Sequence, residues 1–187
     1  MDNAAGRRFR LLDGMILVAA TAAGLAALRT YSPYLLSGSR SRFVPPPWAL
    51  PALVVARGAV WCAPMAAMWS LFATAISLRP PRPRLRRLAA RPGLLACWAA
   101  SLGLVLGLGM TFNFAVSLGV AGGPERFLVF CLMIAYPVGF IVAGAWAAAA
   151  WGGRWRPESR WLDRLGRALG LYWIALIPLS TIVLIFH

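Results

Sequence analysis

The chain has 187 residues, 60% of them hydrophobic, and a formal net charge of +14 whose 19 basic residues are all arginines. A soluble domain has about 45–50% apolar residues, and here the excess falls in blocks of about 20 residues, the length that crosses a bilayer as a helix. The only histidine is the last residue and the three cysteines lie far apart in sequence, which argues against zinc, haem and histidine-dependent chemistry and predicts no cofactor.

The first apolar run, residues 11–28, follows Arg7, Arg8 and Arg10 and is predicted to be a transmembrane helix. A basic segment before a run with small residues would also suit a signal peptide, so cleavage of this run remains open. Residues 29–48 are rich in proline and serine and are predicted to form a loop, with aromatic side chains at headgroup depth.

Four further apolar runs predict transmembrane helices over residues 58–78, 93–120, 127–151 and 169–186, the first of which could begin as early as Trp48. Prolines inside three of them are tolerated in membrane helices when neighbouring groups satisfy the freed carbonyl.

Residues 157–168, before the last run, place Trp161, Leu162 and Leu165 on one helical face and Asp163 among arginines on the other. This pattern predicts an interfacial amphipathic helix. The predicted fold is therefore an all-α integral membrane protein, one bundle of five transmembrane helices plus one cytoplasmic interfacial amphipathic helix.

The arginines are distributed unevenly between the two predicted sides of the membrane. Segments 1–10, 78–93 and 152–168 together hold fourteen of the 19, and five spans put these segments on one side. Because basic loops stay in the cytoplasm, the N-terminus is predicted to be cytoplasmic and the C-terminus outside.

The middle segment, "LRPPRPRLRRLAARPG", has six arginines and no acidic residue. They are expected to contact anionic lipid headgroups; an acidic cytoplasmic partner is the alternative. Nucleic-acid binding is not favoured, because no aromatic residues are interleaved. These residues are Arg79, Arg82, Arg84, Arg86, Arg87 and Arg91.

The run over 93–120 has a small residue at every fourth position, which is typical of a helix-packing surface. Whether this surface packs within the chain or between chains remains open. Its members are Ala99, Gly103, Gly107, Thr111, Ala115, Gly119 and Gly123.

Polar residues in the same run suggest a second role. Thr111, Asn113 and Ser117, with Tyr136 from the following run, could line a polar site, although interhelical hydrogen bonding is the favoured interpretation. No ionisable residue falls in the middle of a predicted span, and no nucleophile–base pair or nucleotide-binding motif is present, so an enzyme is not expected.

The stretches "RFRLLDGMILVAATAAGLA" and "SRWLDRLGRALGLYWIAL" resemble uncharacterised multi-pass membrane proteins of planctomycete-type bacteria. The resemblance implies a bacterial inner-membrane location and no assigned activity. The function hypothesis is therefore a structural or accessory membrane protein acting through helix packing, with itself or with another membrane protein. The alternative is a small transporter, channel or lipid-binding protein.

Overall fold

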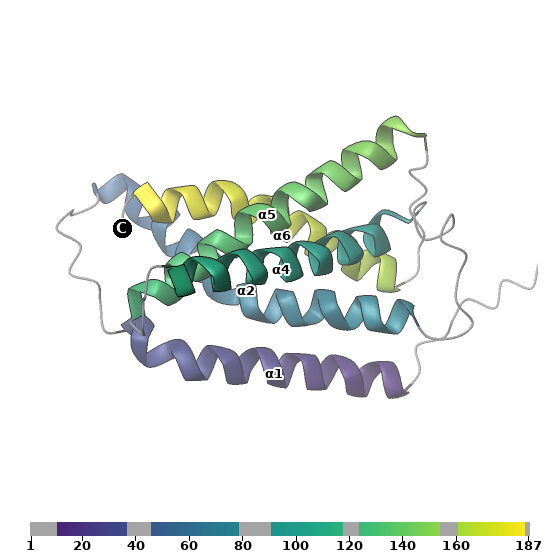
Figure 1. Cartoon of the computed structure of the whole chain (residues 1–187), viewed down its shortest axis with the longest axis horizontal. Coiled ribbons are helices and arrows are strands. Elements are labelled where there is room, and N and C mark those ends of the chain that lie inside the picture. Colours follow the sequence, from purple (N-terminus) through teal and green to yellow (C-terminus); the bar gives the residue numbers. More distant parts are fainter. Residues whose placement is uncertain (1–10, 37–45, 79–90, 118–123, 154–160, 186–187) are drawn as a thin grey trace, which may run out of the picture.

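The computed structural model describes residues 11–36, 46–78, 91–117, 124–153 and 161–185, and within these ranges all regular structure is helical. Figure 1 shows the long helices extending between the two ends of the molecule, with the helix labelled α5 crossing the others obliquely. In chain order the elements are α1 (Leu11–Leu36), the short 3₁₀ helix η1 (Pro47–Ala49), α2 (Leu50–Ser77), α4 (Pro92–Ser117), α5 (Pro124–Trp151) and α6 (Trp161–Ile185).

The predicted all-α class is confirmed over the described residues. Four of these helices are long and apolar enough to cross a membrane, whereas the corresponding apolar part of α1, Leu17–Ala26, is shorter. The architecture is compatible with an integral membrane protein.

α1 extends beyond its predicted run and continues to Leu36, although the sequence predicts a loop from residue 29. α2 begins at Leu50, near the earliest start that the sequence allows for the second run, Trp48. α2 can start there because Pro51 suits the first turn of a helix, where its missing N–H would have no partner.

The stretch predicted as a separate interfacial helix, residues 157–168, differs in the structure. Where it is described, from Trp161 onward, it forms the first turns of α6 and continues without a break to Ile185. Asp163, expected on the polar face, is only 2% exposed. The carboxylate is buried because it accepts a hydrogen bond from the backbone at the start of α4.

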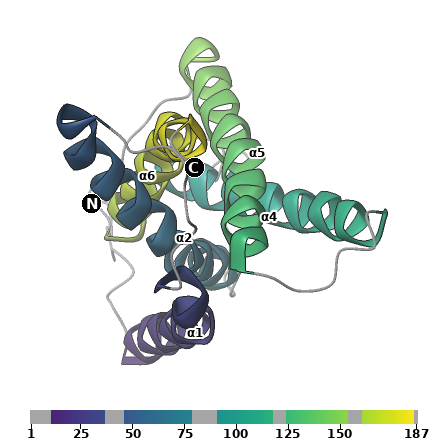
Figure 2. The ribbon, with the colours of Figure 1, turned by 90° about the vertical axis from the view of Figure 1, so that its left-hand side faces the viewer.

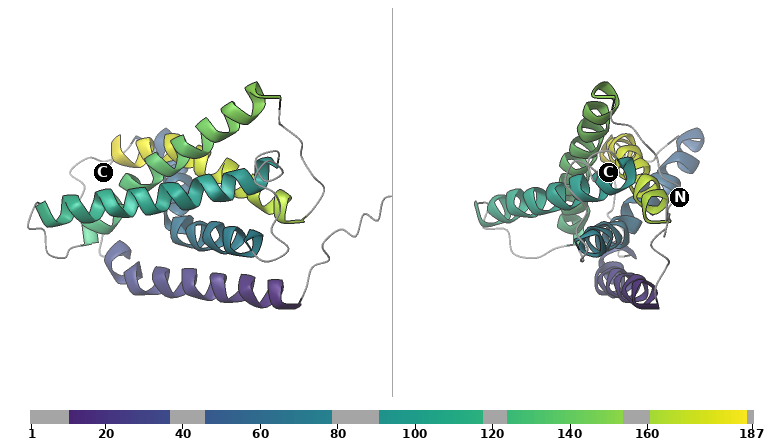
Figure 3. Two further views of the ribbon diagram at one scale, coloured as in Figure 1. Left: turned by 45° about the vertical axis from the view of Figure 1, so that its right-hand side comes forward. Right: turned by 90° about the vertical axis from the view of Figure 1, so that its right-hand side faces the viewer.

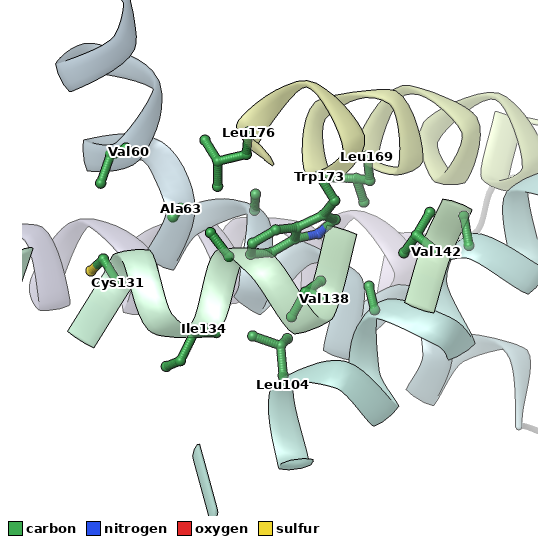
Figure 4. Packing of buried hydrophobic residues seen from close by; sticks show 14 of the residues in the cluster. Val60, Ala63, Leu104, Cys131, Ile134, Val138, Val142, Leu169, Trp173 and Leu176 are labelled. Atoms are coloured by element: carbon green, nitrogen blue, oxygen red, sulfur yellow. The ribbon is translucent and has the colours of Figure 1, made fainter. Parts of the chain in front are cut away.

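The apolar core lies between α2, α4, α5 and α6, and the described residues of α1 contribute nothing to its buried cluster. Its centre is Trp173 of α6, which is 1% exposed and has the largest fully buried side chain. Figure 4 shows the Trp173 ring above Val138 of α5, with Leu104 of α4 below.

α1 lies along one edge of the molecule, beside α2 (Figures 2 and 3). A Cβ on Gly24 would lie 2.8 Å from Met65 Cα, so only a glycine allows this approach of the two helices. One turn earlier, the Trp69 indole N–H donates to Thr21 Oγ1 at 3.1 Å.

α2 changes direction along its length, as Figure 2 shows, and Pro64 lies inside this helix. Proline lacks an N–H and its ring displaces the carbonyl four residues earlier, which opens the helix on that side. The Tyr172 hydroxyl of α6 donates to the Ala59 carbonyl oxygen in this region at 2.6 Å. A neighbouring helix thus provides a polar contact at the bend.

Gly103 and Gly107, two of the small residues of α4, face α5, since an added Cβ would meet Val138 and Ile134 of that helix. Ala99, Gly103, Gly107 and Thr111 are all buried, and a Cβ on Gly103 would lie 2.8 Å from Val138 Cα. Here the pattern packs two helices of the same chain. The side chain of Ala115, and the residues Gly119 and Gly123, lie outside the described part.

Candidate functional site

The first candidate site is the start of α4. The Arg91 carbonyl accepts the first helical hydrogen bond, from the Leu95 N–H at 3.0 Å, so Arg91 is the N-cap residue. Arginine has no acceptor atom to offer the free N–H groups that follow. Asp163, 70 residues later in the chain, supplies one: its Oδ1 accepts the Gly93 N–H at 2.9 Å.

The Asp163 carboxylate is held between this N–H group and an arginine. Arg167, one turn further along α6, places Nε 3.4 Å from Asp163 Oδ2, and its side chain is 34% exposed. A buried carboxylate is costly unless it is both hydrogen-bonded and paired with a positive charge. The partial positive charge at the start of α4 also favours an anion here.

Glycines bring the two helices into backbone contact at this point. A Cβ on Gly93 would overlap the Asp163 carbonyl, and a Cβ on Gly166 would overlap the Gly93 carbonyl. α5 joins the contact, because the Trp146 indole N–H donates to the Pro92 carbonyl at 2.9 Å. We call this contact the α4–α6 junction and define it by Arg91, Gly93, Asp163, Gly166 and Arg167.

A second group of polar side chains lies deeper in the bundle and joins α2 to α4 and α6. Three hydrogen bonds join side chains of different helices: Trp173 Nε1 to Ser70 Oγ at 3.1 Å, Thr74 Oγ1 with Ser101 Oγ at 2.9 Å, and Trp98 Nε1 to Ser77 Oγ at 3.1 Å. We call these six residues the polar cluster. Its buried hydroxyls also bond carbonyls of their own helix, as Ser70 Oγ does with Ala66 at 2.8 Å.

Replacing Ser70 with alanine is expected to lower stability by roughly 0.6–1.7 kcal/mol, the range measured for hydrogen bonds between membrane helices. The Trp173 indole N–H would lose its acceptor in a fully buried position. Unfolding of the purified protein by SDS in mixed micelles, followed by circular dichroism, measures the loss. Ser180→Ala, at a buried position of α6 whose Oγ has no hydrogen-bond partner among the described residues, is the matched hydroxyl deletion and should cost less.

The structure places the residues of the predicted polar site as follows. Thr111 is buried and donates to Gly107 O at 2.8 Å, and the exposed Asn113 donates to Gly109 O at 2.8 Å, both within α4. Tyr136 of α5 bonds Thr181 of α6 at 2.8 Å. The side chain of Ser117 lies outside the described part. A common polar site for these residues stays a prediction.

Of the arginines predicted to contact lipid, Arg91 is described and half-buried at the α4–α6 junction. Arg79, Arg82, Arg84, Arg86 and Arg87 lie outside the described residues.

Sequence reasoning missed the α4–α6 junction and the polar cluster. The sequence did contain a signal for the junction. The stretch "RPG" starts a helix without a capping side chain, so its free N–H groups need an acceptor from elsewhere. The stretch "DRLGRALG" places an aspartate and two glycines along one helical face, which could supply that acceptor at close approach. The serines and threonines of α2 gave no comparable signal, because such residues also bond their own helix.

Within the described ranges, no three His, Cys, Asp or Glu side chains gather as a metal site would require. No family model matches the chain, and neither a curated protein nor a solved structure is similar enough to count as a match. The resemblance to planctomycete-type membrane proteins therefore stays a prediction.

Proposed function

We propose that this chain is an integral membrane protein with a structural or accessory role, acting through helix packing with further copies of itself or with another membrane protein. The observation that carries the proposal is that the buried polar groups of the chain bond to one another across its helices. In the polar cluster and at the α4–α6 junction, these groups hold helices of the chain together. Polar groups of a transport path or an active site would instead face a ligand. The proposal includes no catalytic step.

The proposed topology has five spans, a cytoplasmic N-terminus and an outside C-terminus, in a bacterial inner membrane. In support, the starts of α1, α4 and α6 and the ends of α2 and α5 lie at the same end of the molecule (Figure 1). The three segments that hold fourteen of the 19 arginines adjoin these helix ends. Such a concentration of basic residues is typical of the cytoplasmic side, where anionic headgroups are the expected partners.

One observation favours the alternative, a small transporter, channel or lipid-binding protein. Ser180 of α6 is 0% exposed, and its Oγ has no hydrogen-bond partner among the described residues. It lies next to Thr181, which bonds Tyr136. A buried hydroxyl of this kind would suit a small polar ligand between α5 and α6.

Native mass spectrometry of the protein, extracted gently from its own membrane, separates the two proposals. A defined homo-oligomer or a stoichiometric protein partner supports the accessory role. A monomer that retains a small molecule, with no protein partner, contradicts it and supports the alternative.

The variant Asn113→Leu sharpens this test, because Asn113 is an exposed amide on α4. If Asn113 contributes to assembly, the variant should lose the oligomer or partner and keep its helical circular dichroism. The expected loss is roughly 0.6–2 kcal/mol of association free energy, a three- to thirtyfold weaker complex. Leu102→Ala, an exposed apolar position on the same helix, is the control. Unchanged assembly in Asn113→Leu would remove this residue from the proposed interface.

A further inference from the structure

Three of the helices that form the core contain an internal proline. These are Pro64 in α2, Pro137 in α5 and Pro178 in α6. A proline cannot donate the helical hydrogen bond to the carbonyl four residues earlier, so a helix bends more easily at that point. α2 already changes direction along its length (Figure 2).

Interhelical contacts place the three prolines level with one segment of α6, residues 172–181. The hydrogen bonds that Tyr172 and Trp173 donate to α2 lie on the two sides of the α2 proline. Tyr136, directly before the α5 proline, hydrogen-bonds Thr181 at 2.8 Å. The α6 proline itself belongs to this segment. The prolines therefore divide their three helices at a similar depth of the bundle.

The helices are joined more closely on one side of the prolines than on the other. We call the side that contains the starts of α4 and α6 the junction half, and the opposite side the far half. The polar cluster and the α4–α6 junction both lie in the junction half. The far half comprises residues 50–63 of α2, 124–136 of α5 and 179–185 of α6, and α4 passes through both halves.

Glycine contacts between α4, α5 and α6 show the same difference. In the far half, an added Cβ on Gly107 would lie 3.4 Å from Ile134, an ordinary van der Waals distance. Ser180, also in the far half, is 0% exposed, and its Oγ has no hydrogen-bond partner among the described residues. A region with fewer close contacts opens at a lower free energy. The glycines whose added Cβ would come within 3.0 Å of a neighbouring helix lie in the junction half: Gly93, Gly103, Gly139, Gly166 and Gly170.

We propose that the far half of the bundle opens and closes about Pro64, Pro137 and Pro178, while the junction half stays fixed. The Tyr172 hydroxyl restrains α2 in the closed form. It belongs to the junction half and donates at 2.6 Å to the Ala59 carbonyl, which lies in the far half. A ligand or partner that contacts one of the two forms would shift the equilibrium between them. The inference goes beyond the proposed function and does not depend on an accessory role.

The test measures distances between pairs of nitroxide spin labels by pulsed electron paramagnetic resonance, on the full chain in detergent. The three native cysteines are replaced by alanine, and labelled protein is diluted with unlabelled protein so that only distances within one chain are recorded. The far-half pair is Val54→Cys with Leu184→Cys, and the junction-half pair is Leu71→Cys with Leu171→Cys. All four parent side chains are exposed.

We expect the distance distribution of the far-half pair to be about twice as broad as that of the junction-half pair. Tyr172→Phe keeps the ring that packs edge-on against Trp173 but loses the hydrogen bond to Ala59. It should broaden the far-half distribution further and leave the junction-half distribution unchanged. The matched hydroxyl deletion is Ser77→Ala, which removes the acceptor of the Trp98 indole N–H in the junction half. It should leave the far-half distribution unchanged.

Equal widths for the two pairs in the parent protein would overturn the proposal, and this comparison holds even where a variant does not fold. In variants that keep their helical circular dichroism, Tyr172→Phe would overturn it by broadening both pairs alike or neither pair. An equal effect of Ser77→Ala on the far-half pair would do the same. Equal widths alongside an intact oligomer or partner would leave the proposed function standing, and the reverse result would leave the proline hinge standing.

Discussion

Replacing Gly166 with alanine is expected to separate α4 from α6 and to lower stability by roughly 2–3 kcal/mol, at the upper end for overpacking a well-packed contact. The added Cβ would overlap the Gly93 carbonyl, which is backbone and cannot move aside as a side-chain end can. Gly93→Ala should have a similar effect, because its Cβ would overlap the Asp163 carbonyl. Unfolding by SDS in mixed micelles, followed by tryptophan fluorescence, measures the change.

The matched control is Gly144→Ala in α5, where a Cβ would meet nothing within 4 Å. This variant should unfold as the parent protein does, within about 0.5 kcal/mol. If Gly166→Ala and Gly144→Ala lost stability equally, the close contact between α4 and α6 would be wrong.

Replacing Asp163 with alanine is expected to cost roughly 3–5 kcal/mol, the range for removing one partner of a buried ion pair. The Gly93 N–H would lose its acceptor, and Arg167 would lose the carboxylate 3.4 Å from its Nε. Asp163→Asn keeps an oxygen that can accept the N–H but loses the charge, so its loss should be intermediate. The same SDS unfolding measurement ranks the two variants.

Adding Arg167→Met to Asp163→Ala tests the ion pair directly. The double variant should be more stable than Asp163→Ala alone, because the unpaired charge is removed as well. Arg164→Ala, at an exposed position of the same turn, should change little. Strictly additive losses would show that Asp163 acts only as a hydrogen-bond acceptor for α4.

The helical class could be predicted from the sequence because apolar runs of membrane-spanning length leave few other structures. The residues at which particular helices begin and end could not be predicted in this way. Arg29 belongs to α1 although it follows the apolar run, because a helix whose backbone is already hydrogen-bonded does not need to end where apolar residues end.

Asp163 shows the limit more clearly. The helical periodicity of the sequence placed Asp163 on a polar face beside arginines. A hydropathy value is the same for a carboxylate that faces water and for one that faces another helix, so it could not reveal the contact with α4. The position of Asp163 depends on Gly93 in the first turn of α4, 70 residues earlier in the chain. The same holds for Ser70 and Trp173, whose hydrogen bond joins residues 103 positions apart. Pairings of this kind depend on the relative axial position of two helices, which periodicity within either helix does not contain.

The late position of Asp163 in the chain has a consequence for biosynthesis. A ribosome makes α4 well before it makes α6, so the start of α4 has no Asp163 acceptor until the last helix has been synthesised. The Ser70–Trp173 bond must wait for the same helix. The hairpin of α4 and α5 can assemble earlier, through Gly103 and Val138. A nascent chain released before α6 would therefore lack both contacts, and membrane quality-control proteases would meet it as an open, incomplete bundle.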